Sequence, residues 1–231
     1  MIRAEGEVDV EEVRKRAAAR LDYTEERRQR NIESIAEKAV KYLPSKVSDQ
    51  PVDPDWAFSF FQEAKDTSNA DLQELWARIL AHETANPGTC CKRTLSIVKR
   101  MELRDALAFK KLCRCLFTAG SLPPFVIALE HGLQEIGLNI DEIHELSQLG
   151  LLIQNGPSLS IRPEDVFQFG ERRFKSVAAN KQPFSTSIYP LTSRGRELLA
   201  VADVKLADGY IDALRDHLKA EHNASFELLT A

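Results

Sequence analysis

The first part of the chain has apolar positions at helical spacing. Val10, Val13, Ala17 and Leu21 form one apolar stripe of a helix predicted over residues 10–43. Between residues 22 and 31 this spacing is lost, and charged side chains pair at i,i+3 and i,i+4 instead. We expect this middle part to be solvated or to lie against another chain. The stripe then resumes at Ile32, Ile35, Ala36, Ala39, Val40 and Leu43.

Helical patterns continue to about residue 117. Asp53, which precedes a proline, is typical of a helix N-cap. Ser68, with Asp71 three residues later, resembles a capping box that begins the next helix. We expect two more amphipathic helices before residue 120, the first of which begins at Thr89 or Cys91.

Turn residues become frequent after Gly120, and strands are predicted among short helices. Asn139 and Glu142 form a capping-box pattern for a short helix that ends at Gly150. Residues 151–153 are predicted to pair with residues 158–161 in a hairpin whose turn is Asn155-Gly156-Pro157. The later predicted elements are strand or helix within 163–183, a strand at 185–189, a helix capped by Thr192 and a last helix over 204–218.

Together these patterns predict a mainly α fold in three parts. Residues 1–50 form a charged N-terminal helical segment, and residues 51–120 form a helical core. Residues 121–231 form a region with a small antiparallel β-sheet and a terminal helix.

Composition narrows the class of protein. The 231 residues are 43% hydrophobic and 29% charged, which is typical of a globular protein with its own core rather than a disordered chain. The formal net charge of −4 excludes a wholly basic nucleic-acid binder, although a local basic patch is compatible with it. No apolar run approaches the ~18 residues of a membrane span, and the N-terminus lacks an apolar signal core. We therefore expect a cytoplasmic protein that does not contact membranes.

Residue types that carry chemistry do not gather into a recognised site. Cys90 and Cys91 are adjacent, and Cys113 and Cys115 point roughly 200° apart on a helix, so neither pair matches a zinc motif. We predict four reduced, structural thiols. The paired carboxylates lie in capping or amphipathic contexts, and glycine-rich phosphate loops are absent. We therefore expect no catalytic residue, no cofactor and no metal, and predict that the protein is not an enzyme.

Basic residues are concentrated between residues 92 and 114, a stretch that contains eight Lys or Arg residues and only two acidic residues. Residues seven apart share a helix face, which makes a phosphate-binding surface a candidate. The alternative is that these faces meet acidic faces within the fold or within a homo-oligomer. The candidate nucleic-acid-binding residues are Lys92, Arg93, Lys99, Arg100, Arg172, Arg173, Lys175 and Lys181.

The order of elements in the C-terminal region is similar to the winged-helix fold. The helix that ends at Gly150, the Leu149-Gly-Leu-Leu-Ile153 segment, a hairpin and the Tyr189-Pro-Leu-Thr-Ser-Arg-Gly-Arg-Glu-Leu-Leu199 segment follow its order. The stretch between Gly156 and Ser185 is longer than a usual wing. The helix before the wing carries three carboxylates and no Lys or Arg, so we do not expect it to read a DNA groove.

Several motifs in combination point to a family. They are Arg28-Gln-Arg-Asn31, Val52-Asp-Pro-Asp-Trp56, Leu72-Gln-Glu-Leu-Trp-Ala-Arg-Ile-Leu-Ala81, Asn86-Pro-Gly88 and Arg93-Thr-Leu95, together with residues 146–152 and 189–199. With these motifs nearly the whole chain resembles a bacterial family of unknown function related to the abortive infection alpha proteins. The resemblance implies a role in phage defence and no catalytic residue or cofactor. Cys90-Cys91 departs from it, since an aromatic residue and a serine are expected there.

These observations favour a non-enzymatic regulatory or interaction protein that acts through protein contacts and self-association. The candidate self-association residues are Val10, Val13, Ala17 and Leu21, so we expect a homo-oligomer or a protein partner. The alternative is a winged-helix-like protein that binds nucleic acid through its wing and through the basic face over residues 92–114.

Overall fold

The computed structural model describes residues 10–128, 130–153 and 156–229, without the side chains of residues 130–132. The packing of the backbone divides the chain into two compact units, residues 1–87 and 88–231. The boundary falls inside the stretch that the sequence patterns treat as one helical core. The fold is mainly α, with two small antiparallel sheets in the second unit.

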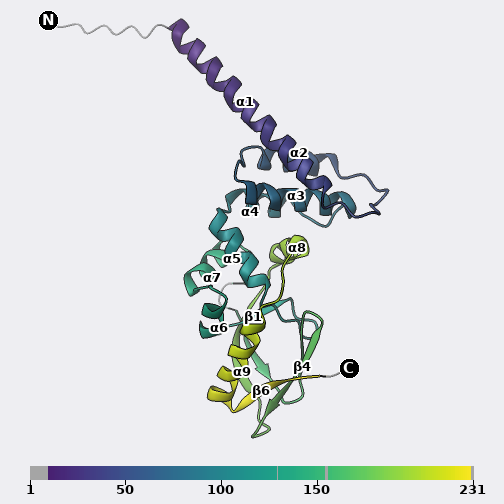
Figure 1. Cartoon of the computed structure of the whole chain (residues 1–231), viewed down its shortest axis with the longest axis vertical. Helices are drawn as coiled ribbons and strands as arrows, with labels where there is room; N and C mark the ends of the chain where they lie inside the picture. Colours follow the sequence, from purple (N-terminus) through teal and green to yellow (C-terminus); the bar gives the residue numbers. More distant parts are fainter. Residues whose placement is uncertain (1–9, 129, 154–155, 230–231) are drawn as a thin grey trace, which may run out of the picture. The chain divides into compact units, whose positions relative to one another are not determined.

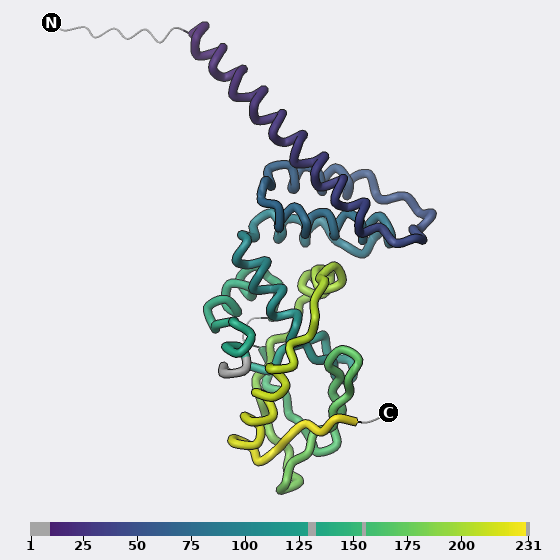
Figure 2. Tube along the Cα trace, in the orientation of Figure 1, coloured from purple at the N-terminus to yellow at the C-terminus, as the bar shows by residue number. Residues whose placement is uncertain are grey.

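The first unit is built from α1 (Val10–Val40), α2 (Pro54–Ala64) and α3 (Ala70–Ala85). The C-terminal part of α1 packs mainly against α3, whereas its N-terminal part extends beyond both neighbours (Figures 1 and 2). Trp56 and Phe60 on α2 and Trp76 on α3 form the core, with the Phe60 ring centroid 5.3 Å from each indole. All three side chains are buried, and their burial and ring contacts stabilise this unit.

One predicted helix start in this unit is confirmed and one is wrong. Asp53 caps α2, since its side chain accepts a hydrogen bond from a first-turn backbone N–H at 2.8 Å. The cap of α3 is Asn69 and not Ser68, because the Asn69 side chain accepts from two first-turn backbone N–H groups at 3.0 and 3.1 Å. The Ser68 hydroxyl instead accepts a hydrogen bond from the Asn31 amide at 3.2 Å.

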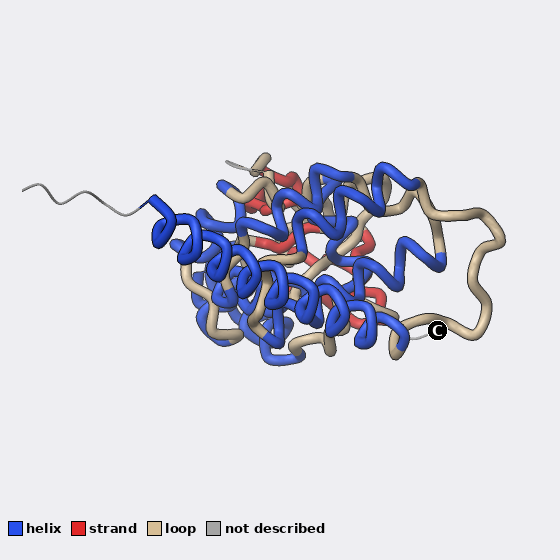
Figure 3. The backbone as a smooth tube through the Cα atoms, turned by 90° about the horizontal axis from the view of Figure 1, so that it is seen from above, coloured by secondary structure: helices blue, strands red, loops and turns tan. Residues whose placement is uncertain are grey.

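The second unit has six helices and six strands among its described residues. Figure 3 draws its strands in red and its helices in blue. The helices are α4 (Lys92–Arg100), α5 (Leu103–Cys113), α6 (Glu130–Glu135), α7 (Ile140–Gln148), α8 (Ser193–Val201) and α9 (Asp208–His222). The strands are β1 (Phe125–Ile127), β2 (Ser158–Ile161), β3 (Val166–Phe169), β4 (Arg172–Ala178), β5 (Phe184–Pro190) and β6 (Ala224–Leu228).

The strands form two three-stranded antiparallel sheets, in the orders β1-β5-β2 and β3-β4-β6, where the sequence patterns indicate only one sheet. The predicted capping box at Asn139 and Glu142 and the predicted cap at Thr192 are both confirmed. The last helix begins at Asp208, four residues later than predicted, and ends at His222.

The predicted hairpin between residues 151–153 and 158–161 is wrong. Residue 155 of its expected turn lies outside the described residues. Strand β2 pairs with β5, with Ile161 opposite Phe184, and the 151–153 segment meets the end of the same strand through a bridge from Leu152 to Leu191. Gly156 permits this arrangement, because a Cβ there would lie 1.6 Å from a β5 carbonyl oxygen. Strand β2 therefore pairs with β5, which is distant in sequence, and not with residues 151–153.

The core of the second unit is an aromatic cluster around Phe117. Its ring centroid lies 5.1 Å from that of Phe169, 6.0 Å from that of Phe226 and 6.2 Å from that of Tyr210. Tyr210 is fully buried, and its hydroxyl donates to the Ile127 carbonyl at 2.8 Å. Burial raises the pKa of this hydroxyl, so it stays a neutral hydrogen-bond donor. The cluster joins β1, β3, β6 and α9, which are distant in sequence.

Candidate interaction surfaces

The four residues predicted for self-association lie on the N-terminal half of α1. Val10, Val13 and Leu21 are 62%, 40% and 58% exposed, and Ala17 is exposed as well. At 100° per residue all four fall within about 40° of Ile35, which is fully buried in the same helix. We call these four residues the α1 stripe. One face of α1 is therefore packed at its C-terminal end and open at its N-terminal end.

Arg28 marks the point where α1 meets the rest of the first unit. Its Nε donates to Asp66 Oδ1 at 2.8 Å, and its Nη1 donates to Glu25 Oε1 at 2.7 Å. The bond to Asp66, and then the bond to Glu25, raises the pKa of the guanidinium, and the bond from Arg28 lowers the pKa of the Asp66 carboxyl. Asp66 lies between α2 and α3, so the pair holds this loop on α1.

A buried amide network continues from Arg28 along the same face. Asn31 Nδ2 donates to the Lys65 carbonyl at 2.8 Å, and Gln73 Nε2 donates to the Thr67 carbonyl at 2.9 Å and to Asn31 Oδ1 at 3.3 Å. Both amide side chains are only 6% exposed. The Arg28–Asn31 motif therefore has a structural task here, which is to bind the loop between α2 and α3.

The α4 group of candidate nucleic-acid-binding residues is exposed. Lys92, Arg93, Lys99 and Arg100 all lie on the solvent side of α4, while Leu95 and Val98 are buried on its other side. Lys92 and Lys99 are seven residues apart and share a face, as do Arg93 and Arg100. Figure 1 shows α4 and β4 well separated within the second unit, so the structure does not bring this group to the candidates on β4.

In the β4 group of candidates, two cations face carboxylates. Arg172 forms an ion pair with Asp208, and Lys175 Nζ lies 3.2 Å from Glu164 Oε2. Arg173 and Lys181 are exposed, the latter in the turn that follows β4 with a left-handed φ of 53°. The positive charges of Arg172 and Lys175 are therefore partly neutralised within the fold.

The start of α4 depends on a residue that the sequence patterns did not single out. Cys91 occupies the N-cap position and its side chain makes no capping bond. Glu197 on α8 takes this role, since its Oε2 accepts from the Cys91 backbone N–H at 2.9 Å and from Thr94 Oγ1 at 2.6 Å. Glu197 and Cys91 are 106 residues apart in the sequence, so no local sequence pattern predicts this contact.

A groove of about 290 Å³ runs along α5, lined by basic side chains. Lys111 Nζ donates to the Gly137 carbonyl at 2.6 Å and Arg114 Nε donates to the Lys205 carbonyl at 3.0 Å, so backbone oxygens orient both cations. Arg104, by contrast, lies near the carboxylates of Glu102, Asp105 and Glu145. The lining residues are Arg104, Leu107, Lys110, Lys111, Arg114 and Glu142.

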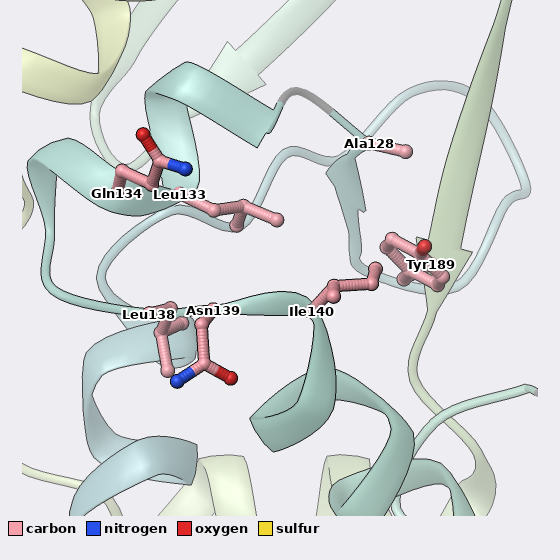
Figure 4. A pocket seen from close by; sticks show the side chains of 7 residues that line it. All are labelled: Ala128, Leu133, Gln134, Leu138, Asn139, Ile140 and Tyr189. Atoms are coloured by element: carbon pink, nitrogen blue, oxygen red, sulfur yellow. The ribbon is translucent and has the colours of Figure 1, made fainter.

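A second pocket of about 330 Å³ lies between α6, the start of α7 and β5. Figure 4 shows Leu133 and Ile140 pointing into it and Tyr189 at one end. The Asn139 side chain at its edge already accepts the Glu142 backbone N–H. The described lining residues suit a small apolar group and among themselves offer no acid, base and nucleophile together; they are Ala128, Leu133, Gln134, Leu138, Asn139, Ile140 and Tyr189.

The four cysteines are free thiols, and three of them are buried. Burial raises the pKa of Cys115 to about 12 and raises the pKa of Cys113 still further, so neither thiol ionises at neutral pH. In the part of the chain that the structure describes, no three His, Cys, Asp or Glu side chains gather as ligands for a metal ion. The described helices include none that is long and apolar enough to cross a bilayer.

Comparison with curated proteins gave no match, and comparison with solved structures gave none. One family model, described as "Protein of unknown function (DUF2806)", matches residues 15–215. The match covers both units and most of the chain, including Ala17 and Leu21 of the α1 stripe. It confirms the resemblance to a family of unknown function that the motifs predicted. The chain belongs to the DUF2806 family.

Proposed function

We propose that this protein is a non-enzymatic interaction protein that assembles through α1. The observation that carries the proposal is the α1 stripe, which continues a packed helix face into solvent. The described part of α1 has no buried residue before Asn31, and Arg27 and Arg28 form ion pairs with Asp66 of the same unit. Before Arg27, every described position of the helix except Thr24 is exposed.

The energetics of this exposed segment support a partner. Surface ion pairs join Glu12 to Arg16 at 3.5 Å and Glu26 to Arg30 at 3.7 Å, and each contributes only about 0.3–0.5 kcal/mol. Most of the stability of a helix in a protein comes from tertiary packing of its amphipathic face, which this exposed segment lacks within its own unit. Burial of the apolar stripe against another chain would add roughly 25 cal/mol for each Å² removed from water.

Sedimentation velocity of the full chain over a range of concentrations tests the proposal. We expect the mass to rise with concentration and the double variant Val13→Asp/Leu21→Asp to remain a monomer. The single variant Leu21→Asp should weaken assembly as well, and its matched control is Ala19→Asp, which places the same charge about 160° away on the exposed opposite face of α1. A wild-type chain that stays monomeric at all concentrations would contradict self-association.

A second candidate function is nucleic-acid binding by an elaborated winged-helix-like region, favoured by the exposed cations of α4. Binding through Lys92, Arg93, Lys99 and Arg100 would be independent of sequence and would weaken steeply with salt. Fluorescence anisotropy with unrelated duplex and single-stranded oligonucleotides at low and near-physiological salt tests it. The variant Lys92→Glu/Lys99→Glu should abolish binding, while Lys175→Glu, whose lysine already faces Glu164, should change it less.

The resemblance to the abortive infection alpha proteins supplies the proposed setting, which is phage defence in a bacterial cytoplasm. Expression of the chain in a phage-sensitive host should lower plating efficiency. The Val13→Asp/Leu21→Asp variant should restore it if assembly through α1 is required. Equal plating with and without the wild-type chain would count against this setting.

A further inference from the structure

We infer that the partner of the α1 stripe is the α1 stripe of a second copy, paired antiparallel about a two-fold axis at Ala17. This inference rests on the proposed function and specifies the occupant of the exposed face. The supporting observations are the spacing of the apolar positions, the size of the central residue and the place where α2 and α3 begin to cover α1.

The spacing of the exposed face is symmetric. Val10, Val13, Ala17 and Leu21 are exposed, and Thr24 at the end of this face is half-buried. The five positions follow one another at intervals of 3, 4, 4 and 3 residues, all within about 40° of the buried face. Antiparallel pairing about the central position sets Val13 against Leu21, Val10 against Thr24 and Ala17 against its own copy. Thr24 suits an apolar contact because its hydroxyl already donates to the Arg20 carbonyl at 2.8 Å.

The residue at the two-fold axis is small. Ala17 is followed by Ala18 and Ala19, and all three are exposed. A methyl group at the crossing point permits two helix axes to approach to about 8 Å, the short end of the usual range. The larger Val and Leu side chains on either side then fill the space beside the crossing.

The packed end of α1 excludes parallel pairing. From Arg28 onward the same face is covered by the loop that carries Asp66 and then by α3. In a parallel pair in register, the covering segments of the two copies would occupy the same space. In the antiparallel pair, Val10 of the second copy lies beside Thr24, one helical turn before Arg28, and the covering segments lie at opposite ends.

The contact is small, and its charges are unfavourable at low salt. Five positions per copy are fewer than the 20–30 residues a side of a standard interface, so we expect a dissociation constant in the micromolar range. Arg16 and Arg20 lie on one flank of the stripe and face the same residues of the second copy. Added salt screens this repulsion, so the dimer should strengthen as NaCl rises.

Disulfide trapping of the full chain tests the geometry. Single cysteines are placed at residues 10, 17, 19 and 24 in a Cys91→Ser background, because the three remaining native thiols are buried. We expect Ala17→Cys to form a covalent dimer by itself, and Val10→Cys to cross-link with Thr24→Cys only when the two variants are mixed. Ala19→Cys, on the opposite face, is the control and should not cross-link above background.

The outcomes separate this inference from the proposed function. Self-linking of Thr24→Cys as fast as that of Ala17→Cys would show a parallel pair and overturn the inference while leaving self-association intact. A concentration-dependent dimer that none of these variants traps would likewise overturn only the geometry. A wild-type chain that sediments as a monomer at every concentration and salt would overturn both.

Discussion

The two halves of α1 share one helix and one face but have different surroundings. Around Ile35 the face is covered by α3, and the buried Gln73 amide donates to Asn31 Oδ1. Around Ala17 the same face meets solvent. The difference shows that an apolar stripe predicts a helix face that can be buried. Whether the same chain buries that face depends on where the neighbouring helices end.

The largest expected contrast comes from matched truncations on the two halves. Ile35→Ala removes a fully buried side chain and should lower the free energy of unfolding by about 2–5 kcal/mol. Val13→Ala should change it by less than about 0.5 kcal/mol in dilute protein. Urea unfolding followed by tryptophan fluorescence measures both, because Trp56 and Trp76 are the two tryptophans and both are buried in the first unit. Equal losses would show that the halves do not differ.

The buried amide network should have the next largest effect. Asn31→Ala removes the amide that donates to the Lys65 carbonyl and leaves the Gln73 amide with the Thr67 carbonyl but without its Asn31 acceptor, which costs about 1–3 kcal/mol. Gln29→Ala is the matched control, since this amide is exposed and bonds only to Glu33 on its own helix among the described residues. The same unfolding experiment compares them, and a control as damaging as Asn31→Ala would refute a structural role for the network.

A smaller effect is expected at the junction of the two halves. The pKa of Asp66 is lowered in the folded chain, so its bond with Arg28 stabilises the fold above the usual pKa of an aspartate, about 3.9. This stabilisation is lost as pH falls through the lower folded-state pKa. Asp66→Asn should therefore be less stable than wild type at pH 7, and the difference should shrink below pH 4. A difference that does not change with pH would contradict the charge assignment.

The smallest effect on the tryptophan transition should come from breaking the exposed half. Ala18→Pro interrupts α1 ten residues before Arg28, and proline costs about 3 kcal/mol in a helix interior. The loss is local, so the far-ultraviolet circular dichroism of the dilute chain should fall while the urea midpoint stays unchanged. A shifted midpoint would mean that residues 10–27 contribute to the packed unit.

Local signals predicted much of the first unit and the helix ends of the second. The caps at Asp53 and Thr192 need only neighbours within one turn, so the sequence alone reports them. Ser68 failed as a cap because Asn31, 37 residues away, uses its hydroxyl. Glu197 was missed because its partner Cys91 lies in another helix. The residues of the α1 stripe were identified from spacing alone, but their exposure was not.

By itself the sequence determined most of the helices, several of their ends and the α1 stripe, because hydrophobic period and capping chemistry act within a few residues. Only the tertiary structure decided which end of α1 is covered, that β2 pairs with β5, and that Arg172 and Lys175 face carboxylates. These contacts join segments distant in sequence, and their free energy depends on burial and geometry that no local pattern encodes.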